Sequence, residues 1–394
     1  MRFFSDPVFS NYSPDSISIK IEEFDMKPLK DVWSELSQPL PAGLGAQNVR
    51  PPVTPNELYE LSYILHRSEF THLAEGRANA VFRIKEPKDP SIPMGFFQGT
   101  LLRVPKATPD VTPCDYETLQ DFQEKFVDVN VGRQHIVPQV LVRITRTVAN
   151  ALNAERKHAL QAKGVKGDQS TIQPGYAMLV EDMGPSADYI ALEFKPKWLA
   201  QSPMAPNDAT RCRTCAREAL RNGKLRKKGL KVSTPVCPLG LIHHDRRVVM
   251  STIDRLAPKW SDRDRERLAD ALKDSGVLER LRDLQEEGDP GDALFTHPED
   301  ARFGLAMTLR DCSCFVRMPI DPDAPVIIKL ADVDKKNWRQ KQSYWQKRHD
   351  DLVNDGWYNE EENLPIETAC VLRLDYCLER GLDIPPVFRT RLKR

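Results

Sequence analysis

The most informative segment of this chain is Tyr189-Ile190-Ala191-Leu192-Glu193-Phe194-Lys195-Pro196-Lys197-Trp198. Its apolar first half predicts a strand, in which residues two apart face the same side. Lys195 and Lys197 should therefore point together, with Glu193 beside them. Because Pro196 cannot donate to a sheet ladder, we expect an edge strand or the end of a strand. Two adjacent ammonium groups repel each other unless an anion lies between them, so a bound polyphosphate and a solvated strand end are the two interpretations.

The composition is that of an ordinary soluble protein. The chain has 394 residues, 29% of them charged and 40% hydrophobic, which suits two domains or one two-lobed domain. No apolar run approaches the ~20 residues of a membrane span, and Asp6 and Pro7 come too early for a signal peptide. We therefore expect an intracellular monomer, in the nucleus or the cytoplasm, that binds no membrane.

The net charge is zero, with 57 basic and 57 acidic residues, which argues against general nucleic-acid binding. The charges are nevertheless unevenly spread. Residues 211–231 contain nine basic side chains and one acidic one, Glu218, whereas residues 262–300 and 350–362 are acidic. A local anion site is compatible with this distribution.

The order of the predicted elements indicates an α+β protein. Residues 1–55 are rich in Pro, Ser and Asp and predict an extended or partly disordered lead-in with one helix at residues 29–36. Strands dominate the first half of the chain and helices the second, which favours an N-lobe over residues 56–188 and a larger C-lobe over residues 189–394. The predicted strands are residues 80–84, 96–104, 176–180, 190–194, 307–318 and 325–333, the last of them central. The predicted helices are residues 116–129, 148–162, 262–287, 340–357 and 368–379.

A small-residue turn around Gly76 precedes the strand at residues 80–84. Glycine lets backbone N–H groups approach phosphates closely, although an ordinary hairpin turn would have the same sequence. Arg103 lies inside an apolar strand and needs a carboxylate or a phosphate as its partner. A glycine turn followed by strands with an internal cation is the layout by which kinases hold ATP, although kinases normally use lysine there.

Carboxylates mark two β-prone segments near the end of the chain. Asp311 lies within residues 307–318, and Asp332 and Asp334 follow the apolar run Val326-Ile327-Ile328-Lys329-Leu330. A carboxylate at a strand end can hold Mg²⁺ while waters and phosphates complete the coordination. A solvated turn is the alternative.

Three of the eight cysteines have the spacing of metal ligands. Cys212 and Cys215 form a Cys-x-x-Cys pair, and Cys237 follows with His243 and His244 close behind. A zinc site would take its fourth ligand from one of these histidines. Three buried thiols are the alternative interpretation.

Together these segments resemble one family. The segments AEGRANAVFR (74–83), LLRV (101–104), EFKPKW (193–198), CRTC (212–215), VCPL (236–239), RDCSCF (310–315), LADVDKK (330–336) and QSYW (342–345) occur in the order typical of inositol-pentakisphosphate 2-kinases. Members usually show a Gly-Glu-Gly-x-Ala-Asn loop and a Glu-Ile-Lys-Pro-Lys strand. Here Ala74 replaces the first glycine, and the usual Leu-Lys-Pro of the last strand is missing. The resemblance covers residues 73–344 and suggests a divergent, fungal-type member.

The resemblance implies a two-lobed kinase-like fold, with an antiparallel sheet in the N-lobe and mixed strands and helices in the C-lobe. It also implies ATP and Mg²⁺ as cofactors. Glu75, Gly76, Ala78 and Asn79 would form the loop that covers ATP. Arg103 would contact the nucleotide phosphates.

The matched positions also imply catalytic and substrate-binding roles. Asp311 would be the general base at the acceptor hydroxyl, and Lys195 would contact the transferring phosphoryl group. Asp332 would hold Mg²⁺. The implied contacts to inositol phosphate are Lys197, Lys336 and Tyr344.

The family resemblance predicts phosphorylation of the 2-hydroxyl of inositol 1,3,4,5,6-pentakisphosphate by ATP, which would give inositol hexakisphosphate (phytate). Another inositol polyphosphate kinase is the nearest alternative. A catalytically inactive protein that binds polyphosphates or nucleic acid on the same fold is the alternative from a different class. Such a protein would be expected to lack Asp311 or Asp332, and both are present.

Overall fold

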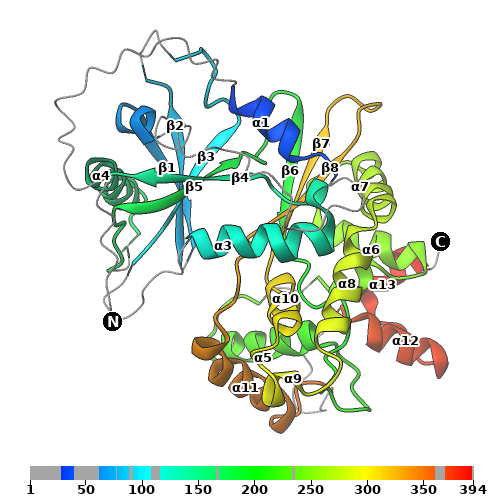
Figure 1. The fold of residues 1–394 in the computed structure, drawn as a ribbon. Coiled ribbons are helices and arrows are strands. Elements are labelled where there is room, and N and C mark those ends of the chain that lie inside the picture. Colours follow the sequence, from blue (N-terminus) through cyan, green and yellow to red (C-terminus); the bar gives the residue numbers. More distant parts are fainter. Residues whose placement is uncertain are drawn as a thin grey trace.

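Two separate antiparallel sheets organise this α+β chain into two lobes of a kinase-like fold (Figure 1). The computed structural model describes residues 28–39, 62–76, 78–87, 92–107, 116–165, 167, 169–232, 236–359 and 369–392. Most of the predicted lead-in, residues 1–27 and 40–55, lies outside the described residues. No helix in the described ranges is both long enough and apolar enough to cross a membrane.

The N-lobe sheet has five strands in the order β1-β2-β3-β5-β4. Alternation decides which face of each strand is buried: Ala80, Phe82 and Ile84 of β2 point into the core, and their neighbours do not. The strands are β1 (Glu69–Glu75), β2 (Asn79–Lys85), β3 (Thr100–Pro105), β4 (Gln139–Ile144) and β5 (Gly175–Glu181). The predicted strand at residues 96–104 starts later than expected, because residues 94–99 form turns.

Two helices complete the N-lobe core. Helix α4 (Arg146–Ala162) begins at Thr145, whose hydroxyl accepts from the backbone N–H of Val148, and it packs its apolar side against β1 and β4. Helix α1 (Leu29–Leu36) occupies the predicted residues 29–36. Its Trp33 is buried, and the indole Nε1 donates to Thr100 Oγ1 of β3 at 3.0 Å.

A helical segment leads from the N-lobe toward the C-lobe core. It consists of α3 (Tyr116–Phe122), a π-helix η2 (Gln123–Gly132) and a 3₁₀ turn η3 (Arg133–His135). Val127 and Val131 of η2 are buried in the same apolar cluster as the C-lobe sheet. The predicted helix at residues 116–129 is therefore confirmed in position, although its second half has π rather than α geometry.

The C-lobe sheet has three strands in the order β6-β7-β8: β6 (Tyr189–Phe194), β7 (Ser313–Pro319) and β8 (Ile327–Ala331). The edge position predicted for residues 189–198 is confirmed. The prediction of a central strand at residues 325–333 is wrong, because β8 lies at the other edge. Its apolar character is explained by burial, since Leu330 is fully buried and its carbonyl accepts from the N–H of Val137 at 2.8 Å.

Helices make up the rest of the C-lobe (Figure 1). The predicted strand at residues 307–318 is wrong in its first part, because α10 continues to Leu309 and packs against α8. The helices are α5 (Arg213–Lys227), η4 (Pro238–Leu241), α6 (Arg246–Leu256), α7 (Asp262–Ser275), α8 (Val277–Gly288), α9 (Ala293–Thr296), α10 (Ala301–Leu309), α11 (Trp338–Asn354), α12 (Val371–Glu379) and α13 (Pro386–Leu392).

Ion pairs connect the two sheets. Glu181, the last residue of β5, accepts from Lys329 Nζ of β8 at 2.5 Å and from Arg317 Nη1 of β7 at 3.4 Å. Lys329 also donates to Ser37 Oγ, at the end of α1, at 2.7 Å. One N-lobe carboxylate therefore holds two strands of the C-lobe sheet beside it.

Candidate active site

The lysine pair converges as predicted. Strand β6 ends at Phe194, just before Pro196, and Lys197 turns the chain with a left-handed backbone, φ 55°. Lys197 Nζ lies 3.0 Å from Asp311 Oδ1, and Lys195 Nζ donates to the backbone oxygen of Asp311 at 2.6 Å. The anion between the two ammonium groups is therefore the Asp311 carboxylate.

Asp311 lies between α10 and β7 and is surrounded by cations. In addition to Lys195 and Lys197, Lys336 approaches the carboxylate, with its Nζ 3.4 Å from Asp311 Oδ2, whereas Lys335 is exposed. Burial raises the pKa of Asp311, but the charges of Lys336, Lys197 and Lys195 outweigh it and hold the pKa below its ordinary value. The group is therefore ionised at neutral pH and able to accept a proton from a hydroxyl.

Asp332 follows the end of β8 and also has a left-handed backbone, φ 57°. Its Oδ2 lies 3.1 Å from Lys195 Nζ, and its Oδ1 lies 3.8 Å from Arg103 Nη2. The side chain is 40% exposed, so its oxygens remain accessible from the site. An accessible carboxylate suits Mg²⁺, which usually takes one or two carboxylates and completes its shell with phosphates and water.

Arg103 of β3 has the carboxylate partner that burial in a strand requires. Its Nη1 donates to Asp334 Oδ1 at 3.0 Å, and its Nη2 makes a second bond to Asp334 Oδ2. Burial raises the pKa of Asp334, but the Arg103 guanidinium, the charge of Lys336 and a hydrogen bond with Asn79 together hold it below its ordinary value. Arg103 lies in the N-lobe and Asp334 in the C-lobe. This ion pair therefore joins the two lobes beside the site.

The loop predicted to cover ATP is the turn between β1 and β2. Gly76 N–H donates to the Asn79 carbonyl at 2.8 Å, and Ala78 accepts from the Lys106 N–H at 2.8 Å. The Glu75 carboxylate forms an ion pair with Lys106 at 3.1 Å and accepts two hydrogen bonds from Arg156. Glu75 therefore anchors the base of the loop.

The structure brings together Lys195, Lys197, Arg103, Asp311, Asp332 and Lys336. Tyr344 instead lies among the cations of α5 and α11: a hydrogen bond with Arg348 and the charges of Arg348, Arg217 and Lys341 lower the pKa of its hydroxyl. The basic run at residues 211–231 largely becomes α5 and contributes Arg217 to this second group of cations.

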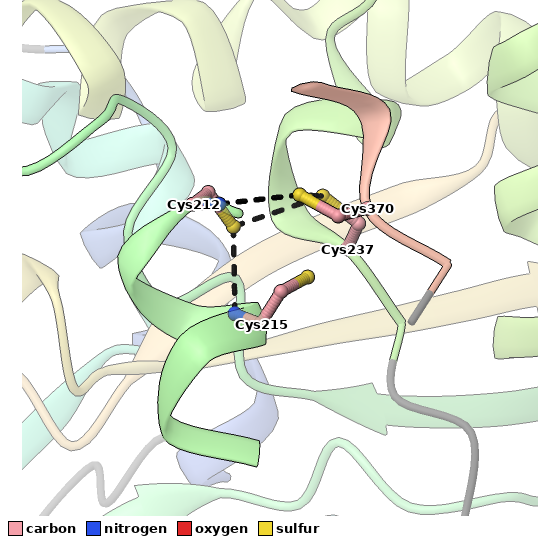
Figure 2. A group of neighbouring side chains, drawn as sticks. All are labelled: Cys212, Cys215, Cys237 and Cys370. Carbon is pink, nitrogen blue, oxygen red and sulfur yellow. Dashed lines mark hydrogen bonds between the residues drawn. The ribbon is translucent and has the colours of Figure 1, made fainter. Parts of the chain in front are cut away.

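The cysteine pair of α5 meets two further thiols (Figure 2). Cys212, Cys215, Cys237 and Cys370 are fully buried, and their sulfur atoms all lie within 4.8 Å of one another. Sequence reasoning placed a histidine in the fourth position and missed Cys370, which is 133 residues from Cys237 and belongs to no local motif.

The two candidate histidines lie elsewhere. The ring of His243 lies tilted beside that of His244, with centroids 4.1 Å apart, and its Nε2 lies 3.6 Å from the carboxylate of Asp375. The Nδ1 of His243 accepts from the Asp245 N–H at 3.0 Å. The histidine prediction is therefore wrong because both ring nitrogens of His243 face other partners and a fourth cysteine completes the cluster.

Comparison with known proteins assigns the family. A family model described as inositol-pentakisphosphate 2-kinase matches residues 72–351, which include every member of the lysine–aspartate cluster. An inositol-pentakisphosphate 2-kinase of Yarrowia lipolytica is 30% identical over 213 residues, covering 53% of this chain and 66% of that protein. One from Candida glabrata is 28% identical over 173 residues, covering 42% of this chain and 55% of its own length. Because the family model matches well over half of the chain, this protein belongs to the inositol-pentakisphosphate 2-kinase family.

Proposed function

We propose that this protein transfers the γ-phosphoryl group of ATP to the 2-hydroxyl of inositol 1,3,4,5,6-pentakisphosphate and releases inositol hexakisphosphate and ADP. The names of the two fungal relatives support this reaction. The observation that carries it is the convergence of Lys195, Lys197 and Lys336 on Asp311.

Charge explains why three lysines gather there. Five phosphates, each carrying roughly −1.5 to −2, give the acceptor a total charge of about −8 to −10. Phosphoryl transfer depends mainly on positioning and charge neutralisation. Without substrate, the Asp311 carboxylate partly neutralises the lysines; the phosphates of the acceptor would take its place as their anionic partners.

The chemical step assigns one role to each central residue. The Asp311 carboxylate takes the proton of the 2-hydroxyl, and the hydroxyl oxygen forms a bond to the γ-phosphorus of ATP. The bond from that phosphorus to the β,γ-bridging oxygen breaks, and its electron pair leaves with ADP. Lys195, which contacts both Asp311 and Asp332, stabilises the charge on the transferring group.

Two cofactor assignments accompany this function. The glycine turn at Gly76 and the Arg103 guanidinium would bind the phosphates of ATP. Asp332 would hold Mg²⁺, which supplies neutralisation of charge on the phosphates. Asp334 is less suited to the metal because both of its oxygens bind Arg103.

Turnover of the purified protein tests the proposal. With ATP, Mg²⁺ and inositol pentakisphosphate we expect hexakisphosphate and ADP in equal amounts, and inositol tetrakisphosphates assayed in parallel should react more slowly. Faster reaction of a tetrakisphosphate would favour the broader inositol polyphosphate kinase. Tight binding of pentakisphosphate without any product would favour the inactive binding protein.

We further infer that the four cysteines hold a structural zinc ion. A tetrahedral zinc with Zn–S bonds of about 2.3 Å keeps its sulfur atoms about 3.8 Å apart. The Sγ atoms of Cys212 and Cys237 are 3.8 Å apart, and those of Cys237 and Cys370 are 4.0 Å apart. Such an ion would tie the start of α5 to the start of α12, because Cys212 and Cys370 are the residues that precede these helices.

Metal content tests the zinc assignment. Untagged protein should contain about one equivalent of zinc, and a chelator should lower its melting temperature. Cys370→Ser should reduce both the zinc content and the stability. Cys377→Ser is the matched control, because Cys377 is a buried thiol of α12 outside the cluster. Metal-free protein of unchanged stability would instead support four buried thiols.

A further inference from the structure

The last turn of α8 binds the segment that carries Lys197. Gln285 is fully buried, and its Nε2 donates to the backbone oxygen of Lys197 at 2.9 Å. Its Oε1 accepts from the Leu199 N–H at 2.9 Å. These backbone groups lie beyond the end of β6, so the amide of Gln285 replaces the partners that a continued strand would have supplied. A left-handed lysine is unfavourable by itself and persists only where its surroundings hold it.

The same turn binds the segment that carries Asp311. Arg310 Nη1 donates to Asp289 Oδ2 at 2.6 Å, and Arg310 Nη2 donates to the backbone oxygen of Gln285 at 3.2 Å. The Arg310 guanidinium also lies over the ring of Trp198, 3.6 Å from its centroid. Arg310 directly precedes Asp311, and Trp198 directly follows Lys197, so the two segments also contact each other one residue away from the site.

Close helix packing holds this turn at a fixed distance from Asp311. A Cβ atom added at Gly288 would clash with the backbone oxygen of Arg302 and would lie 2.9 Å from the Cβ of Ala306. Both are residues of α10, which ends at Leu309, two positions before Asp311. Gln285, Gly288 and Asp289 stand three and four residues apart and therefore share one face of the helix.

We propose that Gln285 is a positioning residue, and that the turn at residues 285–289 sets the distance between Lys197 and Asp311. This role rests on the proposed function. Gln285 is fully buried, so it acts through the backbone of Lys197 and does not touch the substrate. The Lys197–Asp311 distance of 3.0 Å marks the space in which the acceptor hydroxyl and a neighbouring phosphate must fit. A displacement of about 1 Å at such a place costs on the order of 10²-fold in rate.

Gln285→Met tests the role, because methionine has a similar length and lacks the two hydrogen bonds. We expect kcat/KM for inositol pentakisphosphate to fall about 10- to 100-fold, with the KM for ATP unchanged. Gln139→Met is the matched control: Gln139 is a buried glutamine of β4 that donates to Gln120 in the N-lobe. The control should keep both kinetic constants.

A double-mutant cycle separates positioning from general stability. In a Lys197→Ala background, Gln285→Met should cost less than about 2-fold, because the group that it positions is gone. In a Lys336→Ala background, Gln285→Met should lower kcat/KM by the same factor as it does in the wild type. Equal costs in both backgrounds would overturn the proposal, and so would a lower melting temperature with unchanged kinetics.

Calorimetric binding of inositol pentakisphosphate distinguishes failure of this role from failure of the proposed function. If the wild type binds the ligand without turning it over, the proposed function fails. Gln285→Met should then still weaken binding while Gln139→Met does not, and equal affinity in the wild type and Gln285→Met would overturn the role. A wild type that neither binds nor phosphorylates the ligand would overturn both.

Discussion

At the scale of single residues, the backbone itself marks the site. In the described part of the chain, two residues other than glycine have a left-handed backbone, Lys197 and Asp332. Such a conformation costs roughly 1–2 kcal/mol for an L-residue, and it is kept where the surrounding structure holds it, often at functional sites. Both residues lie at the end of a C-lobe strand, and both of their side chains turn toward the cluster around Asp311 and Lys195.

The strain at Lys197 predicts a difference between two substitutions. Lys197→Gly and Lys197→Ala should both raise the KM for inositol pentakisphosphate, because each removes a charged contact. Lys197→Gly should be the more stable by about 1 kcal/mol, because glycine adopts positive φ without a steric penalty. Thermal denaturation checks the order, and equal melting temperatures would mean that the strain at Lys197 is negligible.

Substitutions of Asp311 and Asp332 should impair different steps of the reaction. Asp311→Asn should lower kcat about 10²–10⁴-fold, the usual contribution of a positioned acid–base group, with little loss of ATP or substrate affinity. Asp332→Asn should raise the Mg²⁺ concentration needed for half-maximal rate. Its stability should be nearly unchanged, because asparagine tolerates a left-handed backbone. Turnover, Mg²⁺ titration and calorimetry on both variants provide the measurements, and near-normal turnover of Asp311→Asn would remove Asp311 from the base role.

At the scale of elements, a single glycine divides the long apolar repeat of residues 262–287. Gly276 adopts φ 62°, ends α7 and begins α8 in a new direction. The redirected α8 then packs along α10, which places its last turn against both segments of the site.

The contact between α8 and α10 predicts opposite outcomes for two glycine substitutions. Gly288→Ala must push the helices apart, because its Cβ would meet backbone atoms; we expect a loss of about 1–3 kcal/mol in stability and reduced turnover. Gly304→Ala in α10 has open space around its Cβ and should be neutral or stabilising by up to about 1 kcal/mol. Urea denaturation and kcat should be measured for both variants. Equal stability and equal turnover of Gly288→Ala and Gly304→Ala would argue against close packing at Gly288.

At the scale of the whole molecule, the two lobes are held together by ion pairs across the site. Arg103 and Asp334 form one pair, and Glu181 forms ion pairs with Lys329 and Arg317. Each joins a strand of the N-lobe sheet to a strand of the C-lobe sheet or, for Asp334, to the residues that follow β8. The carboxylate of Asp334, whose pKa is lowered, therefore links the contact between the lobes to pH.

The Arg103–Asp334 pair predicts a pH-dependent stability. The pKa of Asp334 is lower in the folded protein than in the unfolded chain, where it is about 3.9. The ionised carboxylate therefore contributes fully to the free energy of unfolding above that value, and the contribution is lost as the pH falls through the lower pKa of the folded state. Asp334→Asn should lower stability by about 3–5 kcal/mol at neutral pH, because a buried guanidinium loses its partner. The difference in melting temperature from wild type should shrink below about pH 4. Asp188→Asn, at an exposed position, is the control and should show no such difference.

Local patterns in the sequence determined much of the fold. The alternation in β2, the helices α1 and α4, and the edge position of β6 follow from spacing, capping and the proline at position 196. Lys195 and Lys197 meet at Asp311 as expected, but they lie beyond the end of β6 and Lys197 has a left-handed backbone, so strand alternation does not explain their convergence. The candidate site residues from Glu75 to Lys336 were predicted from sequence motifs, which occur here in the order typical of the inositol-pentakisphosphate 2-kinase family.

The contacts between residues that are distant in the sequence could not be predicted from local patterns. The folded structure pairs Arg103 with Asp334, which is 231 positions away, and adds Cys370 to the cysteine cluster. It also brings the side-chain amide of Gln285 into hydrogen bonds with the backbone of Lys197 and Leu199. It also places β8 at an edge and ends α10 where a strand was expected. The physical reason is that propensity and periodicity act over a few neighbouring residues, whereas a buried hydrogen bond or ion pair depends on where the folded chain brings distant groups together.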